Sequence, residues 1–169
     1  MKEVLYKFKN GEGDEFRLRL VSDSRQFLSE EMSSLVEKED FELWGIYLER
    51  LGNAQKVTPM RLLNKISHLI ATFFIGHPKS ILYYQCDDIS EVPMSYNKKK
   101  SGLLVQAYRN RLFTTLFEKV SRKLSVAVVD TPIYIDACGN DIYIHLMSRE
   151  IHVDMAKKIS TDIHEGFDK

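Results

Sequence analysis

The sequence predicts an α+β fold, in which a mainly antiparallel sheet of about six strands carries two or three long helices on one side. Three observations lead to this prediction. Short segments with alternating apolar and polar residues flank glycine-containing turns in both halves of the chain. Two longer segments carry apolar residues at a spacing of three and four. No internal repeat or low-complexity linker divides the 169 residues, so we expect a single domain spanning 1–169.

The first predicted elements are strands. Residues 4–8 and 16–20 each alternate with a period of two around a Gly-containing turn, which is typical of a β-hairpin. Residues 22–40 have a blurred pattern, expected for a short helix or a loop. The aromatic and branched residues of segment 41–50 predict a third strand.

The middle of the chain predicts a helix followed by a buried strand. Thr58 and Pro59 form a favourable helix start, because Thr caps free N–H groups and Pro needs no N–H at the first helical position. An apolar stripe follows over residues 62–74, and Gly76 marks the end of the helix. The apolar run 80–86 predicts a central strand that is buried on both faces.

The last third of the chain predicts another helix, a hairpin and a closing helix. Residues 102–122 repeat with the helical period, and residues 126–135 form a strand in which Pro132 indicates an edge position or a bulge. Residues 142–147 alternate again, and Ser148 is the expected cap of the last helix. The predicted order is β-β-(α)-β-α-β-α-β-β-α, with the bracketed helix the least regular.

The charges cancel over the whole chain, with 24 Lys plus Arg and 24 Asp plus Glu, but they are segregated along it. Residues 23–42 hold seven acids and two bases, whereas residues 97–123 hold eight bases and one acid. Three of these lysines precede a predicted helix N-terminus, where free N–H groups and the helix dipole favour anions. The residues expected to bind an anion or a partner are Lys98, Lys99, Lys100, Arg109 and Arg111.

This charge pattern favours a non-catalytic binding or regulatory module with a basic loop-helix surface, and we favour binding over catalysis. The partner is a protein or a nucleic acid, and no cofactor or metal is expected. The alternative is two solvated faces that attract one another, within the fold or across a homodimer. Whether the acidic segment 23–42 covers the basic segment 97–123 is open at this point.

A second alternative is an acyltransferase-like enzyme of the GNAT type, which holds the coenzyme A pyrophosphate between a strand and a helix. The corresponding pocket would include Cys86, Asp87 and Ser101, but only half of the expected glycine pattern is present around Gly102. Cys86 as a nucleophile needs a nearby histidine, and the adjacent carboxylates raise rather than lower a thiol pKa. A small core residue is the simpler interpretation of Cys86.

Other polar residues are given structural interpretations. Asp130, Asp136 and Asp141 invite a nuclease or metal hypothesis, but the required Lys is missing beside them and the latter two flank a turn. His145 alternates with apolar residues and is interpreted as a satisfied partner of the core.

The cysteine content and the most apolar segment predict the cellular location. Its two cysteines cannot form a disulfide framework, which fits a reducing, cytoplasmic setting. Residues 62–75 form the most apolar segment, which is too short and too polar to span a bilayer, so we expect no membrane contact.

The order of several motifs resembles a family of small bacterial proteins known only as a domain of unknown function. In that family a strand ending in Cys-Asp leads to an Arg-x-Arg-x-Phe helix, and Cys86-Asp87 and Arg109-x-Arg111-x-Phe113 match those positions. The resemblance covers nearly the whole chain, although the loop 89–102 is longer and Leu116-Phe117 replaces an expected Trp-Phe pair. It implies a bacterial, cytoplasmic protein and no particular activity.

Overall fold

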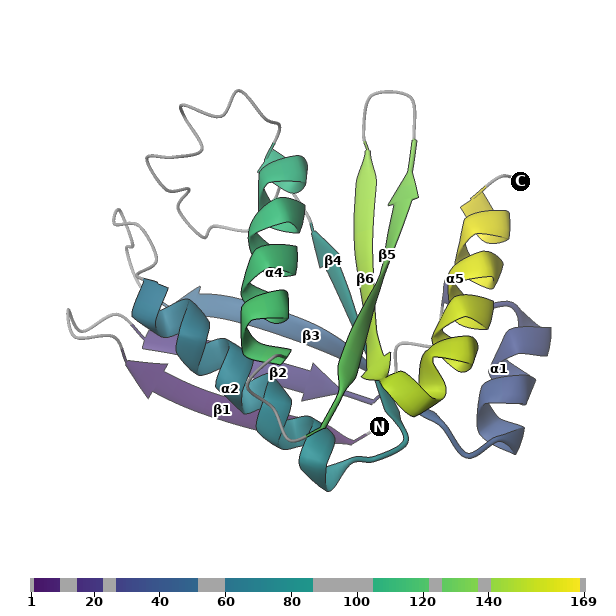
Figure 1. Ribbon diagram of the computed structural model, residues 1–169, viewed down its shortest axis with the longest axis horizontal. Helices are drawn as coiled ribbons and strands as arrows, with labels where there is room; N and C mark the ends of the chain where they lie inside the picture. The colour runs from purple at the N-terminus through teal and green to yellow at the C-terminus, as the bar shows by residue number, and fades with distance from the viewer. Residues whose placement is uncertain are drawn as a thin grey trace.

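The computed structural model describes residues 2–9, 15–22, 27–51, 60–86, 105–121, 126–136 and 141–167. They form an α+β fold around one six-stranded sheet (Figure 1). The strands are β1 (Glu3–Lys9), β2 (Glu15–Val21), β3 (Glu42–Leu51), β4 (Ser80–Cys86), β5 (Val128–Ile135) and β6 (Ile142–Arg149). The helices are α1 (Glu30–Lys38), α2 (Met60–Gly76), α4 (Val105–Ser121) and α5 (Val153–Phe167), and a short 3-10 turn, η2 (Glu150–His152), precedes α5. This is the predicted element order.

The strands lie in the order β1-β2-β3-β4-β6-β5. All neighbours pair antiparallel except β3 and β4, which are parallel and are joined through α2. The central position predicted for β4 is confirmed, because Ile81 and Leu82 point to opposite faces and both are fully buried. β5 is an edge strand, as Pro132 indicated, and its register with β6 runs without a bulge.

The helices cover both faces of the sheet, so the prediction of helices on one side is wrong (Figure 1). One apolar core forms where α2 and α4 pack side by side on one face, around Trp44 and Phe73. A second core forms on the opposite face, where α1 and α5 pack on β4, β6 and β5. The second layer is possible because β4 and β6 alternate apolar side chains on both faces.

The start of the last helix also differs from the prediction. Ser148 lies inside β6 and is fully buried, so it does not cap a helix. The chain turns through η2 after Arg149, and the regular helix begins only at Val153. Met155, Ile159 and Ile163 form its buried face, as predicted, but Ile151 is 79% exposed because it precedes the helix.

Candidate partner-binding surface

The predicted basic surface centres on α4, of which the structure describes part. Arg111 is exposed on this helix, and it has no acidic partner among the described residues. Arg109 is part of the α4 backbone, but its side chain lies outside the described residues, as do Lys98, Lys99, Lys100, Asp87 and Ser101 entirely. Arg111 is therefore the predicted contact residue whose surroundings are known.

Positions 109 and 111 do not share one side of α4. Residues two apart on an α-helix are separated by about 200° around its axis. Position 109 is four residues before Phe113, which packs toward the sheet, whereas Arg111 is in the exposed stripe with Thr115 and Glu118. A flat partner on the outer side of α4 would thus meet Arg111 first.

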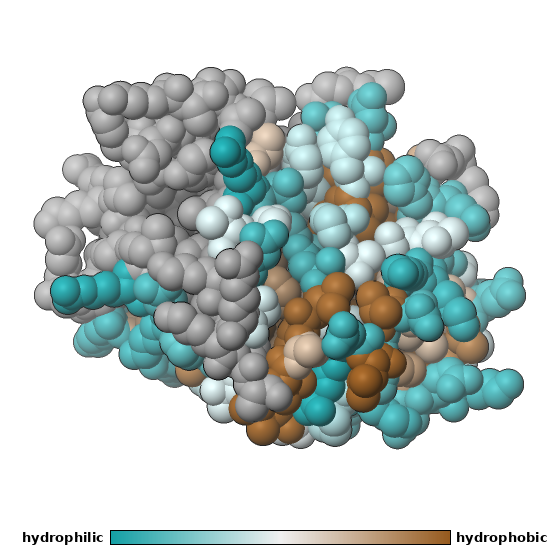
Figure 2. Space-filling view, in the orientation of Figure 1, coloured by the Kyte–Doolittle hydropathy of each residue, from teal (hydrophilic) through white to brown (hydrophobic). Residues whose placement is uncertain are grey.

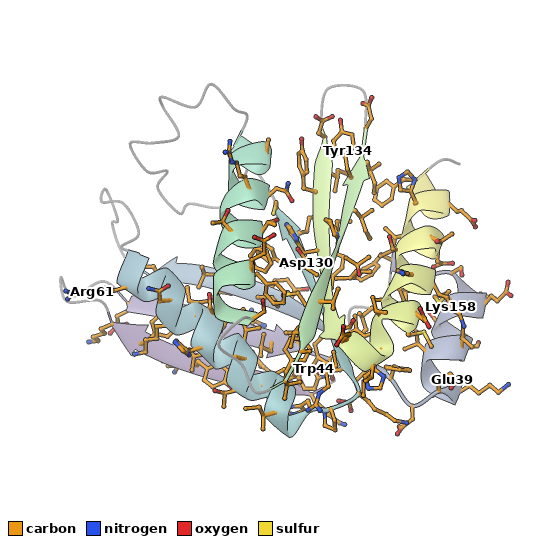
Figure 3. The ribbon with its side chains drawn as sticks, viewed as in Figure 1. Glu39, Trp44, Arg61, Asp130, Tyr134 and Lys158 are labelled. Atoms are coloured by element: carbon orange, nitrogen blue, oxygen red, sulfur yellow. The ribbon has the colours of Figure 1, made fainter. Side chains whose placement is uncertain are left out.

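The sheet separates the acidic helix from the basic one. α1 carries Glu30 and Glu31 in its first turn, both exposed, and Glu39 follows it at the surface. α1 packs against α5 on the face of the sheet opposite to α4 (Figure 1). In Figure 3, Glu39 and Lys158 lie on this α1-α5 side, away from α4. The described part of the acidic segment, 27–42, consequently does not cover α4.

α4 is fixed to the sheet by aromatic stacking. The centroid of the Phe113 ring lies 4.6 Å from that of Tyr84 on β4. It lies 6.2 Å from the ring centroid of Phe117, one turn further along the helix. The imidazole of His145 on β6 also lies 4.6 Å from Phe113. These contacts orient α4 on its inner side and leave Arg111 on the outer one.

Below α4 lie a fully buried histidine and a partly buried aspartate that the sequence interpretation did not join. Oδ2 of Asp130 on β5 and Nδ1 of His145 on β6 are 2.8 Å apart and share a hydrogen bond. His145 is fully buried, and Figure 3 shows Asp130 on the side of β5 that faces α4. Nε2 of His145 and Oδ1 of Asp130 have no hydrogen-bond partner within the described part of the chain.

This pair supports a structural interpretation of His145. A buried imidazole needs at least one partner, and Asp130 provides it at Nδ1. The prediction of a satisfied core histidine is thus met at Nδ1, whereas Nε2 has no hydrogen-bond partner among the described residues. Among the described residues, no group of three or more His, Cys, Asp or Glu side chains is arranged to hold a metal ion.

An open pocket of about 280 Å³ lies between α4 and β5. Thr114, Glu118 and Ser121 line it from the helix, and Asp130 and Pro132 line it from the strand. Among the described lining residues, the polar groups are carboxylates and hydroxyls.

Cys86 ends β4 and is 1% exposed, as expected for a core residue. The alternation of β4 places Cys86 on the same face as Tyr84, and its register partner is Tyr143 on β6. The two other residues of the predicted pocket, Asp87 and Ser101, lie outside the described residues. The acyltransferase-like pocket thus stays a prediction.

Apolar surface is concentrated elsewhere. Figure 2 shows apolar atoms over the end of α2 and the start of α5. Ile75 is exposed at the end of α2, and Ile151 is exposed in η2, just before α5. The side chain of Arg149 donates to the backbone oxygens of Phe74 and Ile75. This patch is separate from Arg111 and adds no charge to the α4 side.

No family model matches the chain. No curated protein and no solved structure matches it either. In the described parts of the chain, no helix has the length and apolar character needed to cross a membrane.

Proposed function

We propose that this protein is a non-catalytic binding module that holds an anionic partner on the α4 side of its sheet. The observation that carries the proposal is the position of α1 on the opposite face, which leaves the charge of Arg111 unopposed by the acidic helix. Had the acidic segment packed on α4, the two charged segments would have neutralised each other. We also propose a bacterial cytoplasmic location, based on the family resemblance and the cysteine content.

The contact surface we propose comprises Arg111 together with the lysines at 98–100. The three lysines precede the start of α4 in the sequence, and the free N–H groups of a helix start favour anions. The contact is electrostatic, so the affinity should decrease as salt increases. A nucleic acid is the first partner to test, because its regular phosphate charge gives the steepest salt dependence.

The experiment is a fluorescence-anisotropy titration of labelled DNA and RNA, single-stranded and duplex, repeated at several salt concentrations. We expect the logarithm of the association constant to decrease linearly with the logarithm of the salt concentration. Arg111→Ala should weaken binding to all sequences alike and reduce the salt slope by about one, and the triple change of Lys98, Lys99 and Lys100 to Ala should reduce it further.

The matched control is Lys158→Ala, which removes an exposed charge of the same sign from α5 on the other face. It should leave binding unchanged. Binding that is absent at low salt, or that Lys158→Ala weakens as much as Arg111→Ala, would count against a nucleic-acid partner on α4. A thermal-shift screen with coenzyme A thioesters tests the enzyme alternative, since a ligand that binds the folded state raises the melting temperature.

A further inference from the structure

Within the part of the chain that the structure describes, no strand pairs with the outer edge of β1. Ser22 N donates to the Lys2 carbonyl at 2.9 Å, so Lys2 and Ser22 form a hydrogen-bonded pair next to the β1-β2 ladder. In an antiparallel ladder such pairs alternate, so even-numbered residues of β1 bond to β2. The N–H and C=O groups of Glu3, Leu5, Lys7 and Lys9 therefore point away from the sheet.

The opposite edge of the sheet is blocked. Glu150 N donates to the Ala127 carbonyl at 2.9 Å beside the β5-β6 ladder, so odd-numbered residues of β5 bond to β6. Pro132 is even-numbered, and its ring nitrogen lies on the outer edge, where it removes a donor from the middle of the strand. Proline on an edge prevents pairing with another strand, and β1 has no such protection along Glu3–Lys9.

A row of alternating charges ends at β1. On the sheet face not covered by α2, Arg19 donates from Nη1 to Glu49 Oε1 at 3.0 Å and from Nε to Glu3 Oε1 at 2.8 Å. Leu5, on the same face of β1, is 44% exposed. Lys7 follows on that face and has no acidic partner within the described residues.

We propose that two copies of this chain pair antiparallel through β1, with Leu5 opposite Leu5 of the second copy. In this register each Glu3 faces Lys7 of the other copy, so the row of charges continues across the junction as Glu49, Arg19, Glu3 and Lys7. The three pairs that face outward, Glu3 with Lys7, Leu5 with Leu5 and Lys7 with Glu3, each exchange two backbone hydrogen bonds. Charged edges usually repel a second strand, whereas here unlike charges meet.

The neighbouring registers are less favourable. A shift by one residue would turn every side chain to the wrong face, so only shifts by two need comparison. One such shift places Leu5 opposite Lys7 and Glu3 opposite Lys9, which already binds Glu15 at 2.8 Å. The other places Leu5 opposite Glu3 and leaves Lys7 without a partner.

The predicted dimer is small and independent of the proposed function. A seven-residue edge buries less surface than a permanent interface needs, so we expect a dimer that dissociates on dilution. Antiparallel edge pairing has its two-fold axis perpendicular to the sheet, so α2 and α4 of both copies lie on the same face. Arg111 is not part of the junction.

The experiment measures mass against concentration by sedimentation equilibrium. The wild-type mass should rise from 19.7 kDa toward twice that value as concentration increases. Lys7→Glu and Glu3→Lys each place like charges opposite one another, so each variant alone should remain at the mass of one copy. Mixed in equal amounts, the two variants should dimerise, because each Glu then faces a Lys.

Lys158→Glu on α5 is the matched control, with the same change in charge and an expected wild-type mass curve. Circular dichroism checks that each variant is folded, since Glu3→Lys also removes a partner of Arg19. Leu5→Lys is a second variant, which changes an exposed side chain. It places two lysines opposite one another at the two-fold axis, so its mass should also remain that of one copy. A wild-type mass that never rises, Lys7→Glu dimerising like the wild type, or a mixture that stays at one copy would overturn the proposal.

Discussion

The carboxylate of Asp130 and the imidazole of His145 lie diagonally on neighbouring strands and are joined by a hydrogen bond of 2.8 Å. Asp130 is opposite Met147 in the β5-β6 register, and His145 is opposite Pro132, so both side chains are on the α4 face. In this geometry the carboxylate oxygen is placed to accept from an N–H at Nδ1 of the imidazole. Because His145 packs against Phe113, this hydrogen bond fixes a side chain on which α4 rests.

Removing the carboxylate should destabilise the fold. Asp130→Ala leaves the Nδ1–H of a fully buried imidazole without its acceptor, which should lower the free energy of unfolding by about 1–3 kcal/mol. Asp130→Asn retains an acceptor oxygen and should cost less. Urea denaturation followed by the fluorescence of the single tryptophan, Trp44, measures both. Glu165→Ala, exposed on α5, is the control, and an equal loss in all three variants would contradict the prediction.

Ser29 should matter more than its exposure indicates. It is the N-cap of α1, with Oγ accepting from Met32 N at 3.1 Å, and its own N–H donates to Asp162 Oδ2 on α5 at 2.9 Å. Ser29→Ala should therefore cost about 1 kcal/mol, as for other N-caps. Ser34→Ala, also exposed on α1 but bonded only within the helix, should cost less in the same urea titration. A larger loss for Ser34→Ala would contradict the cap assignment.

Substitutions at two adjacent residues of α2 should differ strongly in their effect on stability. Phe74 is 1% exposed in the core shared with Trp44, whereas Ile75 is 57% exposed. Phe74→Ala should lower the free energy of unfolding by about 3–5 kcal/mol, because it leaves a cavity. Ile75→Ala should change it by less than about 0.5 kcal/mol, as for ordinary surface positions. Thermal and urea unfolding of the pair test the orientation of α2, and comparable losses would show that the helix is rotated.

Stability at alkaline pH should depend on Tyr83. Burial, with a smaller contribution from Tyr47, raises the pKa of Tyr83 from 10.0 to about 12. The folded state thus favours the neutral phenol. The contribution of this group to stability is complete below pH 10 and is lost as the pH rises toward about 12.

The measurement compares wild type with Tyr83→Phe, whose ring does not ionise. Urea midpoints should fall more steeply for the wild type than for the variant above pH 10. Tyr134 and Tyr143 titrate in both proteins, so the difference between the two curves reports Tyr83. The variant also lacks the hydrogen bond from the Tyr83 hydroxyl to Gln85 Oε1 at 3.1 Å, and this loss lowers its stability wherever the phenol of the wild type is neutral. Parallel curves would contradict the prediction.

Much of the fold follows from local patterns in the sequence. Alternation predicts β1, β2 and β6, aromatic and branched residues predict β3, and an apolar run predicts β4. The 3.6 spacing predicts α2 and α4. Pro132 predicts the edge position of β5 for the same local reason, a missing donor. The layer formed by α1 and α5 is harder to foresee, since it depends on the pairing of β4 with β6. The paired residues are 57 to 65 positions apart in the sequence, and no local pattern fixes this pairing.

The proximity of Asp130 and His145 could have been predicted from the sequence. The hairpin predicted around Gly139 and Asn140 already places both residues on one face, since their offsets from the turn have the same parity. The pair is missed when Asp130 and His145 are interpreted separately. The relation of the acidic and basic segments could not be predicted, because it depends on which face of the sheet each helix covers.

The single proline of β5 limits how far this sheet can grow. A strand edge that lacks a donor at its centre is a poor template, so head-to-tail stacking of β1 onto β5 of another molecule would lose a hydrogen bond at each junction. Growth through the edges is consequently restricted to one side of each molecule. Any assembly built in this way closes after two molecules and does not propagate into fibres.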